Sequence, residues 1–116
     1  MKKKIPTDIL IEIEAQQTIS NVTGVFSLST IKRLIEQHSC NKEMVAEAMQ
    51  LAETMPFEEI QEAIATYDSS SPKMDELQFI KDLMIKYKVS RGDVIKRIQY
   101  VRRIIKRMKE EENNAN

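Results

Sequence analysis

Two of the side chains best suited to chemistry, His38 and Cys40, lie two residues apart, with Glu36 and Glu43 close by. Such groups can bind zinc, but a zinc site needs four ligands, usually supplied in pairs, and the sequence has no second His or Cys. The single His also leaves little material for a Ser-His-Asp triad, and no Gly-x-Ser-x-Gly motif or phosphate-binding loop accompanies it. We therefore expect no enzymatic activity, metal or cofactor, and we interpret Cys40 as a buried residue at a turn.

A basic segment near the C-terminus is the strongest chemical signal. Between Lys86 and Lys109 there are ten Lys or Arg and one acid, Asp93, although the formal net charge of the whole chain is zero. Residues 1–80 carry a net charge of −6 and residues 81–109 a net charge of +9. This asymmetry predicts an anionic partner for the basic part. The alternative is a solvated helix face whose charges neutralise the acidic half, within the chain or across a dimer.

The composition predicts an all-α protein. The 116 residues include only two Gly and three Pro, and good helix formers dominate. We expect one small domain, residues 1–116, of five to six helices, the last of them long. Hydrophobicity alternates along part of residues 7–17, so a short strand is an alternative to a helix there. The expected helices are 7–17, 30–38 with Ser29 as its cap, 42–53, 55–67, 75–88 and 90–111.

The expected helices group into sub-units of opposite charge. Residues 29–67 form an acidic helical hairpin plus a helix, 68–75 a linker, 75–111 a basic hairpin, and 112–116 a disordered tail. Ten acids against two Lys between Glu36 and Glu76 should repel DNA. We interpret this acidic face as scaffold, with a dimerisation surface or a protein-binding face as the alternatives.

A weak internal repeat relates the two hairpins. When the chain is shifted by 49 residues, Ile31 aligns with Ile80 and Val45 with Val94. The expected breaks "SCN" and "KVS" also coincide, which predicts a shared helix–turn–helix shape. Chance similarity between two amphipathic hairpins is the alternative.

The stretch "LMIKYKVSRGDVIKRI", residues 83–98, resembles the helix-turn-helix motif of bacterial DNA-binding regulators. Met84 departs from the pattern, since a small residue is usual there, and so does Lys88, where a turn Gly is common. The resemblance is to the motif and to no particular family. It implies a duplex DNA partner and a role in transcription regulation, in a bacterial or phage-like setting. The residues that match the motif are Leu83, Tyr87, Val89, Ser90, Val94 and Ile98.

The resemblance also assigns residues to roles. The N-terminal part of the second helix would enter the major groove. A capping box formed by Ser90 and Asp93 would fix the residue at which this helix begins. Lys96 and Gln99 would reach base edges, and Gly92 would allow close approach of the backbone. The remaining cations would lie near phosphates. The predicted DNA-binding residues are Lys86, Lys88, Ser90, Arg91, Gly92, Lys96, Gln99, Arg103 and Arg107.

An apolar stripe follows the other side of the same helix. Its spacing of three and four residues suits either packing within the chain or the seam of a homodimer. The sequence therefore predicts a non-enzymatic DNA-binding regulator, with a helical adaptor or homo-oligomerising module that docks on an acidic partner as the alternative. The lack of a signal peptide or long apolar run predicts a cytoplasmic protein without membrane contact. The stripe consists of Val94, Ile98, Val101, Ile105 and Met108.

Overall fold

The structure is a computed structural model that describes residues 4–23 and 28–114. Within those ranges it contains six helices and no strand, which confirms the predicted all-α fold. The residues that also permitted a strand belong to a helix. The helices are α1 (Thr7–Thr23), α2 (Leu28–His38), α3 (Lys42–Thr54), α4 (Phe57–Ser69), α5 (Glu76–Tyr87) and α6 (Arg91–Asn114).

Short polar side chains and a proline mark where several helices begin. Asn41 precedes α3, and its Oδ1 accepts a hydrogen bond from the Glu43 backbone N–H at 2.7 Å. Asp75 precedes α5, and its Oδ1 accepts a hydrogen bond from the Leu77 backbone N–H at 3.1 Å. Pro56 precedes α4, where its missing N–H costs no helical hydrogen bond.

Three helix ends differ clearly from those expected. Helix α1, expected to end at residue 17, continues to Thr23. Ser29 was predicted to cap the second helix, but α2 already begins at Leu28, so Ser29 lies within its first turn. At the other end of the chain, α6 continues through Asn114 and so includes residues 112–114, which the sequence interpretation assigned to the tail.

The backbone repeats at the 49-residue interval seen in the sequence. Ser39 follows α2 with φ of 52° and Lys88 follows α5 with φ of 56°, both in the left-handed region. In each case the backbone N–H of the following residue donates a hydrogen bond to a carbonyl of the preceding helix. Cys40 donates to the Ile35 carbonyl at 3.0 Å, and Val89 donates to the Met84 carbonyl at 3.2 Å. A capping side chain then starts the following helix, Asn41 in one hairpin and Ser90 in the other. The two hairpins therefore share one turn design.

Each hairpin has its own buried cluster. The first cluster joins α1, α2 and α3 with Ile104 of α6, and the second joins the end of α3 with α4, α5 and α6. Phe57 and Tyr100 pack against both clusters and so connect them. The chain is thus built as two three-helix units, α1–α3 and α4–α6, whose cores meet along α6.

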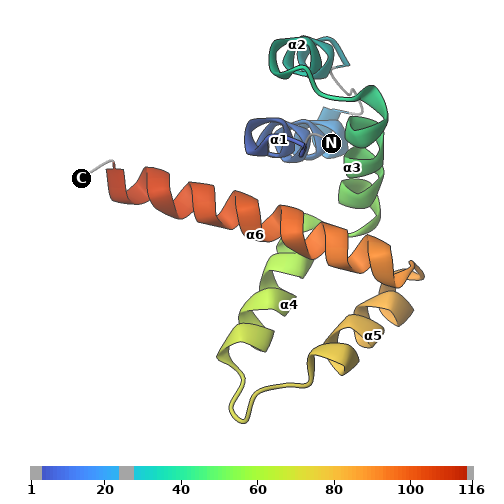
Figure 1. The fold of residues 1–116 in the computed structure, drawn as a ribbon, viewed down its shortest axis with the longest axis vertical. Helices are drawn as coiled ribbons and strands as arrows, with labels where there is room; N and C mark the ends of the chain where they lie inside the picture. Colours follow the sequence, from blue (N-terminus) through green and yellow to red (C-terminus); the bar gives the residue numbers. More distant parts are fainter. Residues whose placement is uncertain (1–3, 24–27, 115–116) are drawn as a thin grey trace.

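Helix α6 is the element that holds the two units together. It runs across the middle of the molecule, with α1, α2 and α3 on one side and α4 and α5 on the other (Figure 1). It packs directly against α1, α3, α4 and α5. Because four helices pack against it, much of α6 is engaged in packing or in polar contacts.

The shared left-handed turn residues give a first prediction. A side chain with a Cβ is strained in this region, whereas Gly is not, so Lys88→Gly and Ser39→Gly should each raise the free energy of unfolding by about 0.5–1 kcal/mol. Urea unfolding followed by circular dichroism would measure the gain. Lys88→Ala is the matched control, because it removes the charge but keeps the Cβ, and it should give no gain. An equal gain in Lys88→Ala would contradict the backbone explanation.

Candidate nucleic-acid interface

The turn between α5 and α6 has a sharply defined geometry. Lys88 closes α5 in the left-handed conformation, at the position where the motif often has Gly. Ser90 Oγ accepts the Asp93 amide at 3.2 Å, which confirms half of the predicted capping box. The hydrogen bonds of the described residues do not include the reciprocal one from the Ser90 amide to Asp93. A Cβ on Gly92 would meet only Ser90 Oγ, at 3.9 Å, so packing does not require a glycine there.

The apolar stripe of α6 is rotated from the one predicted. Val94 and Val101 are fully buried as expected, and Ile98 and Ile105 are partly buried. Met108, however, is 50% exposed and contributes little to the core. The remaining positions on the buried face belong to Ile104 and Arg97, neither of which the sequence interpretation had included. Most of the stripe is therefore core, and it leaves no continuous seam for a second copy.

Arg97 is a buried cation at the centre of the molecule. Its side chain is surrounded by protein, with 1% of the residue exposed. Nε donates to the Met55 carbonyl at 2.9 Å, and Nη1 forms an ion pair with Glu14 of α1. Met55 lies at the end of α3, so one guanidinium joins α6 to α1 and to the junction between the two units. Nη2 is buried and has no hydrogen-bond partner among the described residues.

Two of the predicted DNA-binding cations pair with acids of other helices. Lys86 Nζ lies 3.5 Å from Glu59 Oε1 of α4, and Lys96 forms an ion pair with Glu47 of α3. The hydrogen bond to Glu47 raises the pKa of Lys96. Both pairs are substantially exposed, so their net contribution to stability is small.

The other two paired cations contact the start of the chain. Arg103 Nη2 donates to Thr7 Oγ1 at 3.0 Å and to the Ile5 carbonyl, and burial lowers the pKa of this half-buried guanidinium. Arg107 forms an ion pair with Asp8, whose hydrogen bond raises the pKa of Arg107. These contacts attach α1 to α6. They also account for part of the charge asymmetry, because basic residues of α6 meet acidic residues of the first 80.

The remaining face of α6 points to solvent and is cationic. Gln99 and the two predicted residues at its start, Arg91 and Gly92, are exposed. Further along, Arg102 is exposed as well, although both of its terminal nitrogens donate to Asp68 at 2.9 Å. Arg91 and Gln99 are eight residues apart, with the partly buried Ile95 between them, and the later spacings are three or four residues, so these side chains follow one side of the helix for roughly 27 Å. We call this face the cationic ridge: Arg91, Gln99, Arg102, Lys106 and Lys109, with Lys88 of the turn beside it.

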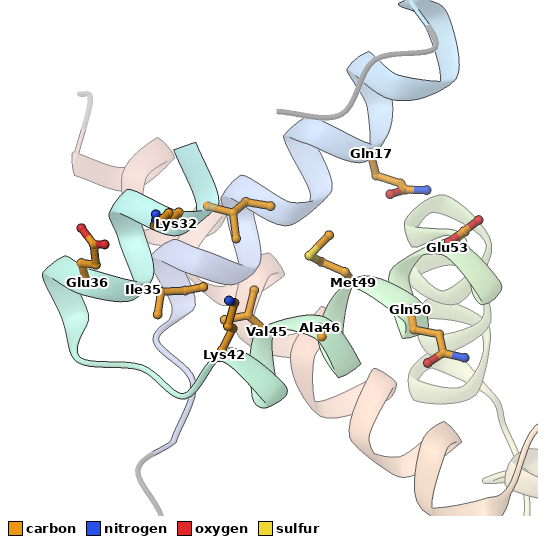
Figure 2. Close-up of a pocket in the computed structure, with 11 residues that line it drawn as sticks. Gln17, Lys32, Ile35, Glu36, Lys42, Val45, Ala46, Met49, Gln50 and Glu53 are labelled. Carbon is orange, nitrogen blue, oxygen red and sulfur yellow. The ribbon is translucent and has the colours of Figure 1, made fainter. Parts of the chain in front are cut away.

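The first unit carries an apolar groove in place of a cationic ridge. It lies between α2 and α3, has a volume of about 950 Å³, and Gln17 of α1 lies at its edge. Figure 2 shows Ile35 and Met49 on its apolar walls, with Lys32 and Glu36 at the rim. The lining mixes opposite charges around aliphatic surface and brings together no set of catalytic side chains.

The residues that first suggested chemistry differ in their exposure. Cys40 is a buried free thiol in the core of the first unit, as predicted, and its Sγ lies 3.9 Å from the Asn41 carbonyl oxygen. His38 is only half-buried. Across residues 4–23 and 28–114 there is no cluster of three or more His, Cys, Asp or Glu able to hold a metal ion. None of the helices described is both long and apolar enough to cross a membrane.

Comparisons with known proteins add no assignment. No protein-family model, no curated protein and no solved structure matches the chain.

The buried ion pair gives a prediction about stability. Glu14→Ala would leave the Arg97 guanidinium buried without its carboxylate, so we expect the free energy of unfolding to fall by about 3 kcal/mol. The double variant Glu14→Leu/Arg97→Met removes both charges and should be less destabilising than Glu14→Ala alone. Urea unfolding of the three proteins would measure this order. A double variant less stable than Glu14→Ala would contradict the prediction.

A third prediction concerns pH. Burial, and then the hydrogen bond that Tyr87 donates to Glu59 at 2.7 Å, raise the pKa of the Tyr87 phenol from 10.0 to about 12. Its contribution to stability is therefore complete below pH 10.0 and is lost as the pH rises through about 12. The difference in tyrosinate absorbance between wild type and Tyr87→Phe would report this titration. Glu59→Gln should shift the pKa of Tyr87 back towards 10.0; a wild-type value already near 10.0 would exclude the contact.

Proposed function

We propose that the chain binds duplex DNA through the α5–α6 hairpin and acts as a small cytoplasmic regulator of transcription. The observation that carries the proposal is the cationic ridge, which lies on the exposed side of α6 and starts at the turn. The hairpin also has the local features of a helix-turn-helix: a left-handed turn residue at Lys88 and a capped start of the second helix at Ser90.

The N-terminal end of α6 is the part of the ridge best suited to read DNA. Arg91 is exposed at the first helical position, and neighbouring backbone N–H groups at the helix start favour a phosphate oxygen. Gly92 presents no side chain, and its lack of packing contacts leaves room for close approach to a groove. Gln99 lies two turns further along on the same face, within reach of base edges.

The ridge differs from the set of cations proposed on sequence alone. Lys88, Arg91, Gly92 and Gln99 stay in the proposed interface, with Ser90 as the cap. Lys106 and Lys109 join it as phosphate contacts because they are exposed on the same face; Arg102 lies on that face too, but its guanidinium is already paired with Asp68. Four of the cations predicted from the sequence are paired within the molecule, two of them with α1, and these contacts give them a structural role without DNA.

The two halves of the chain provide a matched test. Arg91 and Lys42 occupy equivalent positions 49 residues apart, each exposed and each the first residue of its helix. An acid is well tolerated at the start of a helix, so Arg91→Glu and Lys42→Glu should both fold. We expect Arg91→Glu to weaken binding to a labelled random-sequence duplex about tenfold. The slope of log K against log salt should also become shallower by about 1, the amount expected for one lost phosphate contact. Lys42→Glu should leave both the affinity and the slope unchanged.

Fluorescence anisotropy at several salt concentrations would measure both quantities. Wild-type affinity should fall linearly on a plot of log K against log salt. No binding even at low salt would exclude the proposal and favour the adaptor alternative. Equal losses in the two variants would show that the ridge is not the binding surface. Lys96→Glu and Arg103→Glu are poor probes, because each also breaks a contact inside the molecule.

A further inference from the structure

We propose that the groove between α2 and α3 binds a short amphipathic helix of a protein partner, with an acidic residue at the start of that helix and a basic residue at its end. This inference goes beyond the proposed function and does not rest on it, since the groove belongs to the first unit and its occupancy can be measured without DNA.

The wall of the groove on α3 has the dimensions of a helix-binding surface. Lys42, Ala46, Met49 and Glu53 follow one another at spacings of four, three and four residues, so they form one line along the helix. Ile35 of α2 forms the opposite wall (Figure 2). The line is about 16 Å long, which is the length of three helical turns. Its apolar middle suits a ligand helix with anchors three or four residues apart.

The repeat shows that the hairpin does not need this groove to fold. The residue equivalent to Ala46, 49 positions later, is Ile95 of α6. Ile95 is partly buried and packs against the second cluster, whereas Ala46 lines the groove. Because both hairpins share one turn design, the small side chain of Ala46 leaves open a space that the same design can fill with an isoleucine.

The charged side chains of the lining are divided between the two ends of the groove (Figure 2). Two cations, Lys32 and Lys42, and one anion, Glu36, lie towards one end, and Glu53 lies at the other. Within the part of the chain that the structure describes, none of these four forms an ion pair. A net positive charge at one end and a negative charge at the other are thus available to a ligand.

The stability of α3 itself does not account for this order of charges. Lys42 is the first residue of α3 and Glu53 the last but one, whereas a helix dipole disfavours a cation at the start and an anion at the end. A ligand helix with an acid beside Lys42 and a base beside Glu53 pairs both groups, and the same order suits its own dipole. The ligand helix therefore runs in the direction of α3. A long-chain carboxylate would pair only with the lysines and would place its apolar tail beside Glu53.

Fluorescence anisotropy with the full chain and a labelled peptide would test the proposal. The peptide carries Glu, Leu, Leu and Lys in this order, at spacings of four, three and four residues, in a background of Ala and Gln. We expect saturable binding with a Kd of the order of 10 µM. Ala46→Ile should raise the Kd at least about tenfold, because the larger side chain fills the groove. Ala65→Ile, at an exposed alanine of α4, is the matched control and should leave the Kd unchanged.

An exchange of charges tests the direction of the ligand and does not depend on the folding of Ala46→Ile. Glu53→Lys should weaken binding of this peptide about fivefold. It should strengthen, by a similar factor, the binding of a second peptide in which Glu replaces the final Lys. Glu62→Lys, at an exposed acid of α4, should leave both affinities unchanged.

Four outcomes would overturn the proposal. The first two are no saturable binding of the peptide to wild type at about 500 µM, and equal binding by a folded Ala46→Ile variant. The third is an equal effect of Glu53→Lys on the two peptides, because binding would then be independent of charge. The fourth is a different occupant without peptide binding: dodecanoate, or a second copy seen as a dimer that Ala46→Ile abolishes. None of these outcomes bears on whether the cationic ridge binds DNA.

Discussion

The arrangement of the helices depends on one buried guanidinium. Arg97 lies where α6 passes the end of α3 and the side of α1, and no apolar side chain could satisfy both the Met55 carbonyl and the Glu14 carboxylate. Burying a charge is costly unless it is paired and hydrogen-bonded, so α1 and the α3–α4 junction must be in place for α6 to be accommodated. The interaction therefore fixes the position of one three-helix unit against the other. It adds this geometric constraint to two apolar clusters that pack mostly within their own units.

The same burial decides which face of α6 is available to a ligand. Placing Arg97 and Ile104 inside rotates the helix so that Arg103 and Arg107 point towards α1, while Arg102 and Lys106 point outward. The charge asymmetry of the chain therefore has two structural origins. Part of it consists of ion pairs between and within the two units, and the rest is the exposed ridge on which the proposed DNA interaction depends.

The sequence predicted the kind of structure well and the phase of its last helix poorly. Local signals were sufficient for the number of helices, for the positions of the turns at Ser39 and Lys88, and for the cap at Ser90, because each depends on residues a few positions apart. The buried face of α6 depends on partners far away in the sequence, since Glu14 lies 83 residues from Arg97. A run of Arg and Lys residues is typical of an exposed helix face. No neighbouring residue in the sequence marks Arg97 as the member of the run that is buried. The groove depends on tertiary packing in the same way.

The contact between Lys96 and Glu47 joins residues that are themselves 49 positions apart, so equivalent positions of the two units touch each other. Contact between equivalent positions is the geometry of a symmetric pair of subunits. In a pair of identical chains a charged residue at such a point would meet its own copy and be repelled. Within one polypeptide the two positions can differ, and an acid can face a base. Covalent continuity thus permits an attractive contact at a place where exact symmetry forbids one, and it allows one unit to be acidic while the other keeps its cationic surface.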